Sequence, residues 1–344
     1  MEEFNRDMGV SEDFVDAHVA IRPLLSNAKI ERWFKRYDRA AVLWKKAYEF
    51  FGALSLVCIA AAALYLGYRL ALAPTYGVLR ELDAAGVIVG AVGLISQLVL
   101  IFAQLRDRWL LSRFAAERLR CLKFQAFRAL FEPQRDPDLA LAVDRHAERE
   151  VAGLRQELRA GYTAIGAFSP SATLPVWTAS REGEADILQQ AREVYDDLRI
   201  AMQLQHFEGR IEIARKKEQS PGALSDWVFV LASLLTLTEL SLNGLHLVAN
   251  FDAPEIPAFI QPWWWFVVWS LFVISAVLAI YGQARVQRVD ADRYEQYRRE
   301  IVEVRNQKVA DWTSFASRVY AMELIALREL QDFCRDQRYF GYLF

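Results

Sequence analysis

The sequence predicts an all-α integral membrane protein, with two transmembrane helical hairpins and long cytoplasmic helices packed as bundles or coiled coils. Two observations support this fold class. Uncharged apolar stretches alternate with segments dense in Arg and Glu, and several of the apolar stretches are long enough to cross a hydrocarbon layer about 30 Å thick. The charged segments show the apolar periodicity of amphipathic helices. Over 344 residues, 54% are hydrophobic and 24% are charged, which suits a few spans joined to large water-facing parts.

The first water-facing segment ends in a helix that leads toward the membrane. Within IERWFKRYDRAAVLWKKAYEF, one helical face carries Trp33, Tyr37, Ala41 and Trp44, with Arg and Lys beside it. Aromatic and basic residues in this arrangement are typical of an anchor at the membrane interface. The N-terminus, MEEFNRDMGVSEDF, is acidic and has no apolar core. We therefore expect no cleavable signal peptide.

Two uncharged runs follow and predict the first hairpin, with spans over about 50–72 and 84–105. Residues 50–68 alone give about 28 Å of helix at about 1.5 Å per residue. On the second helix one face holds Gly86, Gly90, Gly93, Gln97 and Gln104. Small residues allow helices to approach closely, so we expect the glycines to mediate helix packing. The two glutamines either extend this packing through hydrogen bonds or line a pore.

The middle of the chain predicts water-facing helices around a loop. A helix leaving the membrane after Arg106 has an apolar stripe that requires a partner: Leu111, Ala115, Leu119, Leu122 and Ala126. Asp136 and Pro137 suit the cap and first turn of a helix that reaches about Arg159. The turn-rich segment that follows predicts a loop, and a further helix is expected over about 183–217.

The third span, predicted over about 227–251, has an orderly polar face. Spacings of three and four residues place on one side Thr236, Glu239, Asn243, His246 and Asn250. An ionisable side chain at bilayer depth normally faces a protein interior or a water path. Glu239, Asn243, His246 and Thr236 are thus candidate pore-lining or gate residues, with Gln97 and Gln104. The alternative is that Glu239 is protonated, or hydrogen-bonded to a partner such as Gln97, and holds a helix bundle together.

The fourth span is predicted over about 262–284, with Trp263, Trp264 and Trp265 at its start. Basic residues follow it, and four are candidate phosphate contacts: Arg288, Arg293, Arg298 and Arg299. Positive-inside anchoring explains these arginines without a ligand. The same rule places the N-terminus, the middle segment and the C-terminus of this multi-pass protein in the cytoplasm.

The C-terminal segment has heptad-like spacing that predicts a helix packed against others, within one chain or between copies. Its apolar positions are Trp312, Phe315, Val319, Met322, Ala326, Leu330 and Phe333.

Several kinds of chemistry have no support in the sequence. A net charge of -2 does not favour nucleic-acid binding. Three distant cysteines predict neither a disulfide framework nor a zinc site. Phosphate-loop, dinucleotide, zinc-protease and nucleophile-elbow motifs are not found, so we expect no enzyme, no cofactor and no metal site.

The two halves of the chain share a layout of basic helix, hairpin and long charged helix. The runs that show it are ERWFKRYDRAAVLWKKAYEF, WLLSRFAAERLRCLKFQAF and RYEQYRREIVEVRNQ. This layout resembles tandem SLATT domains, the two-transmembrane effector domains associated with nucleotide-signalling synthases and SLOG sensors. The resemblance implies an N-terminal tail over 1–29, one two-span unit over 30–160, a linker loop over 161–183 and a second unit over 184–344.

The resemblance also implies a function. SLATT proteins are thought to be pore-forming or membrane-perturbing effectors of bacterial anti-phage systems, released by a nucleotide or other ligand. We therefore expect a homo-oligomeric pore or ion channel in the lipid bilayer, gated by a nucleotide second messenger or by its synthase or sensor. Two alternatives stay open: a membrane-anchored scaffold that recruits a protein partner through its cytoplasmic helices, and a constitutive bestrophin-like channel.

Overall fold

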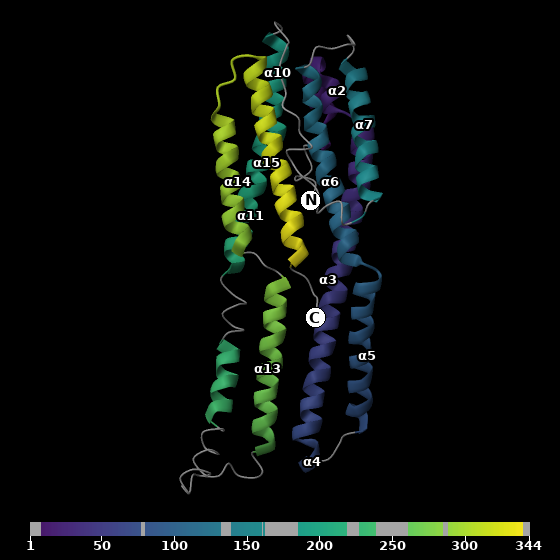
Figure 1. Ribbon diagram of the computed structural model, residues 1–344, viewed down its shortest axis with the longest axis vertical. Helices are drawn as coiled ribbons and strands as arrows, with labels where there is room; N and C mark the ends of the chain where they lie inside the picture. Colours follow the sequence, from purple (N-terminus) through teal and green to yellow (C-terminus); the bar gives the residue numbers. More distant parts are fainter. Residues whose placement is uncertain are drawn as a thin grey trace. The chain divides into compact units, whose positions relative to one another are not determined.

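The computed structural model describes residues 8–76, 80–131, 139–159, 161, 185–218, 227–238, 261–284 and 288–339 (Figure 1). Within these residues every regular element is helical, as predicted. The chain divides into two compact units. Unit 1 comprises Met1–Lys45, Arg106–Ala214 and Arg288–Tyr339, and unit 2 comprises Lys46–Leu105, Arg215–Gln287 and Phe340–Phe344. Each unit takes segments from both halves of the sequence.

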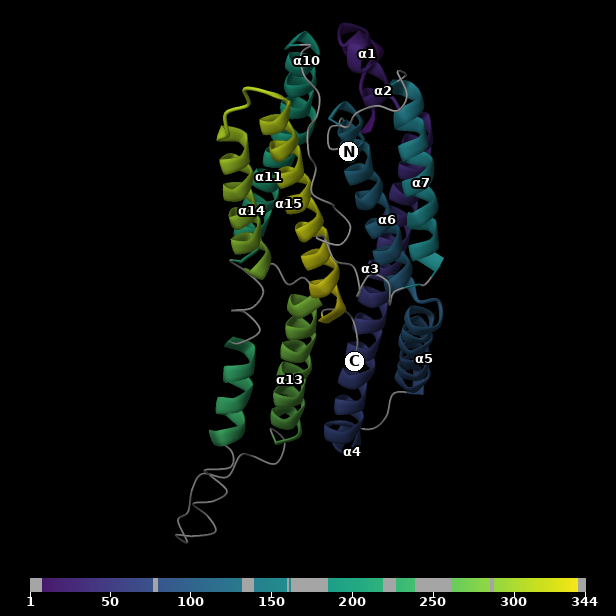
Figure 2. The ribbon, with the colours of Figure 1, turned by 45° about the horizontal axis from the view of Figure 1, so that its top comes forward.

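Unit 1 is a helical bundle. Apart from the first part of α3 (Ala28–Ala71), its described elements are α1 (Glu12–Ala17), η2 (Val19–Ile21), α2 (Arg22–Leu25), α6 (Leu105–Gln125), η3 (Ala126–Leu130), α7 (Leu139–Arg159), α10 (Ala185–Tyr195), a π-helical segment η4 (Asp196–Ala201), α11 (Met202–Glu218), α14 (Arg288–Asn306) and α15 (Trp312–Tyr339). Figures 1 and 2 both show α14 beside α15, to which a short turn joins it.

Side-chain caps fix where two of the longest helices begin. The Asn27 side-chain oxygen accepts the backbone N–H groups of Lys29 at 3.2 Å and Ile30 at 3.1 Å, which starts α3. Before α15, Asp311 Oδ1 accepts the Ser314 N–H at 2.7 Å. Such caps satisfy N–H groups of the first helical turn, which have no acceptor within the helix.

Two apolar clusters fill unit 1, and α6 and α15 contribute to both. The first cluster joins α1, η2, α2, η3, α10, α11 and α14, with Phe127, Tyr195, Phe207 and Phe315 among its buried residues. The second packs Ile30 and Phe34 of α3 against α6, α7 and the end of α15. The predicted stripe of α15 is confirmed, because six of its positions are buried and Phe333 packs partly buried against the second cluster; the six are Trp312, Phe315, Val319, Met322, Ala326 and Leu330.

The segment before α3 packs more closely than the predicted tail suggests. Ile21, Leu24 and Leu25 are each at most 1% exposed and belong to the first cluster. The helix expected over about 183–217 is present as the continuous run of α10, η4 and α11. Residues 132–138, with the predicted cap at Asp136 and Pro137, lie outside the described residues, as does most of the expected loop.

Unit 2 is a set of apolar helices. It contains the second part of α3, α4 (Ala73–Tyr76), α5 (Arg80–Phe102), a helix over Trp227–Thr238 and α13 (Gln261–Ala284). Three helices are long and apolar enough to cross a membrane, and the segments that qualify are Val19–Ala71, Asp83–Phe102 and Gln261–Ile280. Their outward side chains are apolar, as shown by Val87 at 71%, Leu94 at 63% and Phe102 at 78% exposure. The remainder of the predicted third span lies outside the described residues.

Candidate functional site

The candidate pore helix is described only as far as Thr238, so Glu239, Asn243, His246 and Asn250 lie outside the described residues. The Thr236 hydroxyl donates a hydrogen bond of 2.9 Å to the carbonyl of Ala232, one turn earlier. Its polar group is thus satisfied within its own helix, an arrangement that allows threonine to lie in an apolar environment.

The two candidate glutamines occupy different settings. Ser55 of α3 is fully buried and donates a 3.1 Å hydrogen bond to the Gln97 side-chain oxygen, which places Gln97 against the first span. Gln104 does not share a helical face with Gln97, contrary to the prediction. The helix ends at Phe102 instead of Leu105, and Gln104 follows it with a left-handed φ of 48°. Its N–H donates to the Ile101 carbonyl at 3.2 Å, which closes the last turn of α5 before α6 begins.

The glycines of α5 lie where this helix approaches α3. A Cβ at Gly86 would stand 2.4 Å from the ring of Tyr65, and one at Gly93 would stand 3.0 Å from Cys58 Cβ. At Gly90 the nearest atom would be 3.6 Å away, which is ordinary contact. Close helix approach therefore depends on Gly86 most strongly.

The candidate phosphate contacts are spread along α14, and the three whose side chains the structure describes, Arg293, Arg298 and Arg299, make different contacts. Arg288 is the first residue of that helix. The guanidinium of Arg293 lies 5.4 Å from the ring of Tyr294. Arg298 pairs with Glu208 at 3.6 Å, and Arg299 Nε donates to the Glu295 carbonyl at 3.4 Å. For these last two residues, contacts within the protein account for the geometry.

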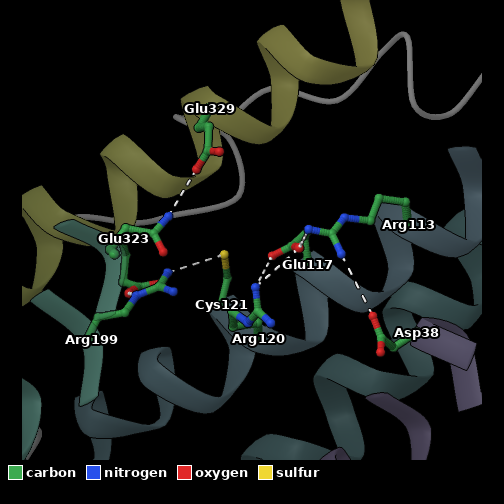
Figure 3. A network of polar contacts seen from close by, with 9 residues as sticks. Asp38, Arg113, Glu117, Arg120, Cys121, Arg199, Glu323 and Glu329 are labelled. Atoms are coloured by element: carbon green, nitrogen blue, oxygen red, sulfur yellow. Dashed lines mark hydrogen bonds and ion pairs between the residues drawn. The ribbon is translucent and has the colours of Figure 1, made fainter. Parts of the chain in front are cut away.

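A buried ion pair in unit 1 was not predicted from the sequence (Figure 3). Arg199 Nε donates to Glu323 Oε1 at 2.8 Å, and its Nη2 donates to Oε2 at 3.1 Å. Tyr195 donates its hydroxyl to Oε1 at 3.2 Å, and the guanidinium lies 4.7 Å from the ring of Phe124. The side chains of Arg199 and Glu323 are 2% and 0% exposed. This bidentate geometry compensates for the removal of both charges from water.

The protonation states follow from this burial. Burial acts to lower the pKa of Arg199, but the Glu323 carboxylate outweighs it and holds that pKa well above its usual range. Burial raises the pKa of the neighbouring Cys121 thiol to about 12, although Arg199 Nη2 lies 3.6 Å from its sulfur. A thiol that stays protonated is a poor nucleophile, so Cys121 is a packing residue.

A second polar cluster continues from this pair along α6. Arg120 donates to Glu117 at 3.0 Å, Arg113 also pairs with Glu117, and Arg113 lies 3.8 Å from Asp38 of α3 (Figure 3). Burial would raise the pKa of Glu117, but the two guanidinium groups lower it to about 2. Nearby, burial and the charge of Glu117 raise the pKa of Glu329 to about 7.

The π-helical segment η4 places Arg199 in the core. In a regular α-helix, the face of Leu198 would continue at residue 205, but Gln205 is exposed, whereas Leu204 and Phe207 are buried. The wider π turn delays the apolar face and turns Arg199 and Ile200 inward. Two features of the sequence could have indicated this arrangement. The helical face that carries the apolar residues shifts within residues 198–204, and the charged residues Arg199 and Glu323 each follow a core residue by four positions, Tyr195 and Val319 respectively.

An open surface cavity of about 660 Å³ lies beside η4. Its polar lining consists of Gln189, Arg192, Glu193, Asp196, Asp197 and Arg305. Asp196 Oδ1 forms an ion pair of 3.1 Å with Nη2 of the buried Arg318. Side chains of both signs of charge line this cavity. Among the described residues no group of three potential ligands could hold a metal ion.

Comparison with protein-family models, with characterised proteins and with solved structures finds no match.

Proposed function

We propose that this chain is a membrane effector of a bacterial conflict system, which assembles into an oligomeric pore gated by a cytoplasmic nucleotide or other ligand. The observation that supports it best is the composition of unit 2. Its three long helices meet the length and apolarity that a bilayer requires, and they turn large apolar side chains outward. Water would penalise this exposed surface, whereas lipid would not.

The proposal includes the predicted third span, over about 227–251, which brings the number of spans to four. The described beginning of this segment is helical and exposes Trp227 at 73%, Leu234 at 56% and Leu237 at 58%. With four spans, the two short connections face outward, and both termini lie in the cytoplasm of a bacterial inner membrane. The basic flanks of the spans favour this orientation.

Unit 1 is the proposed receiver of the signal. It is charged and carries a buried ionic network, and α3 supplies residues to both units without a break in the helix. A change in the packing of unit 1 would therefore act on a helix that continues into the apolar part. The resemblance to tandem SLATT domains supports the same division of roles.

Ion flux from liposomes tests the proposal. The full-length protein is compared with Glu239→Leu, which removes the ionisable group from the polar face of the third span. Thr238→Val is the matched control, because Thr238 is the neighbouring residue and its hydroxyl is already bonded to the Leu234 carbonyl at 2.8 Å. Each protein is assayed with and without a panel of cyclic mononucleotides and dinucleotides.

Three outcomes distinguish the candidate functions. Ligand-dependent flux that Glu239→Leu abolishes and Thr238→Val retains supports the gated pore. Flux without any ligand indicates a constitutive channel. A correctly assembled wild-type protein that conducts under no condition refutes the pore and favours the scaffold, for which Glu239→Leu would leave partner binding unchanged.

A further inference from the structure

Two cation–ring contacts join α3 and α6 where the charged segments of the chain meet the uncharged runs. The guanidinium of Arg108 lies 5.0 Å from the ring centre of Trp44, and the ammonium of Lys45 lies 5.9 Å from that of Trp109. Each helix thus supplies one ring and one cation to its neighbour. These contacts hold long basic side chains against rigid indole rings, and each contact is favourable in itself.

The position of this cluster in the sequence places it beside the apolar helices. Lys45 lies five residues before the uncharged run that starts at Phe50, and Arg106 directly follows the run that ends at Leu105. In a membrane protein, such positions lie at the depth of the lipid headgroups, where Trp is enriched. The site therefore rests on the membrane insertion that is part of the proposed function.

Positive charge in the cluster exceeds what the protein neutralises. Within the described part of the chain, Arg106 and Arg108 form no ion pair with a carboxylate, and the buried Nη2 of Arg106 has no hydrogen-bond partner. Both arginines lie in the first turn of α6, where free backbone N–H groups add further positive potential. Asp107 lies between them in sequence, but adjacent residues on a helix do not face each other.

We propose that Arg106 and Arg108, with Lys45 and the rings of Trp44 and Trp109, bind the phosphate of an anionic phospholipid headgroup. Arg108 is exposed, so its guanidinium can reach a phosphodiester oxygen at the surface. Guanidinium groups suit phosphate because they present paired N–H donors in one plane. A zwitterionic headgroup brings its own cation into the same positive field, so the site selects anionic lipid.

The test measures lipid binding by the full-length protein in detergent, with no dependence on ion flux. Native mass spectrometry and thermal stability are followed during titration with phosphatidylglycerol or phosphatidylcholine. The wild type should bind phosphatidylglycerol more tightly. Arg106→Gln/Arg108→Gln should weaken that binding by roughly 30-fold, the effect of removing two cations near a headgroup (about 2 kcal/mol).

Two further variants keep the result interpretable. Arg149→Gln/Arg159→Gln removes the same charge from exposed positions on α7 and should bind as the wild type does. Arg106→Lys/Arg108→Lys preserves the charge, so it should retain most of the preference for phosphatidylglycerol. Flotation of the wild type with phosphatidylcholine vesicles tests membrane insertion separately from lipid selectivity.

The proposal is overturned by equal affinity for the two lipids, or by equal losses in the first-turn and α7 variants. It is also overturned if inorganic phosphate without lipid stabilises the wild type as strongly as phosphatidylglycerol does, because the site would then bind a soluble anion. If the protein floats with vesicles and prefers phosphatidylglycerol but conducts no ions, the lipid site is supported and the proposed pore is refuted. If the protein does not float, both the lipid site and the proposed pore are refuted.

Discussion

Two titratable groups of unit 1 should give opposite and separable pH dependences of stability. His206 and Glu329 both lie near the charge of Glu117. Burial, aided by the charge of Arg210, lowers the pKa of His206 to about 4 from its ordinary 6.5. Burial, aided by Glu117, raises the pKa of Glu329 to about 7 from its ordinary 4.5. The two perturbations are the isosteric variant Glu329→Gln, whose amide oxygen can still accept the 3.0 Å hydrogen bond from Gln203, and His206→Gln.

The signs follow from proton binding. Between pH 4.5 and 7 the folded state holds a proton on Glu329 that the unfolded state has lost, so stability falls as pH rises through this window. Between pH 4 and 6.5 the unfolded state binds a proton on His206 that the folded state does not, so stability rises with pH. Each slope is at most about 1.4 kcal/mol per pH unit, and they cancel where the windows overlap.

The assay is thermal unfolding of the full-length protein in detergent at closely spaced pH values from 4.5 to 7. Relative to the wild type, Glu329→Gln should gain stability with rising pH up to 6.5, because only the histidine contribution remains. His206→Gln should lose stability with rising pH up to 7, because only the glutamate contribution remains. The largest change over either window is about 3 kcal/mol. Profiles for both variants that run parallel to the wild type would refute these pKa displacements.

Two further experiments test packing. Arg199→Met leaves the buried Glu323 carboxylate without its cation, so a denaturant titration should show a free energy of unfolding lower by about 3–5 kcal/mol. Adding Glu323→Leu removes the unpaired carboxylate and should restore most of this loss. A double variant as unstable as the single one would contradict the assignment of a buried ion pair. Gly86→Ala should destabilise the hairpin by about 1–3 kcal/mol, because its Cβ would stand 2.4 Å from the Tyr65 ring. Gly90→Ala is the control and should be tolerated, because the nearest atom to its Cβ would be 3.6 Å away. Equal melting temperatures for the two variants would show that α3 and α5 do not pack in this way.

Apolar periodicity was sufficient to predict the helices that depend on it. The predicted α15 stripe is buried from Trp312 to Leu330, and the stripe predicted after Arg106 is buried from Ala115 to Ala126. The two end members, Phe333 and Leu111, are partly buried. Each of these faces repeats over several turns, so no single residue decides the outcome. Charge-free length likewise sufficed for α5 and α13, although the end of α5 was misplaced because nothing in the residue type of Gln104 indicates a left-handed backbone.

The buried ion pair could not be predicted by the same reasoning. Arg199 and Glu323 lie 124 residues apart in sequence, and each is a type of residue that is rarely buried without a partner. A partner on another helix is not visible in local spacing. The extra residue in η4 compounds the difficulty, since the inward position of Arg199 depends on a π turn that ordinary α-helical periodicity does not anticipate.

The division into units follows composition more closely than it follows the repeated layout of the two halves. Two of its boundaries fall after Lys45 and after Leu105, where charged segments end and resume. Charged helices bury one face and solvate the other, whereas uncharged helices have no face that favours water. Segments with the same requirement therefore pack together irrespective of their order in the chain, and the duplication remains a prediction about sequence layout.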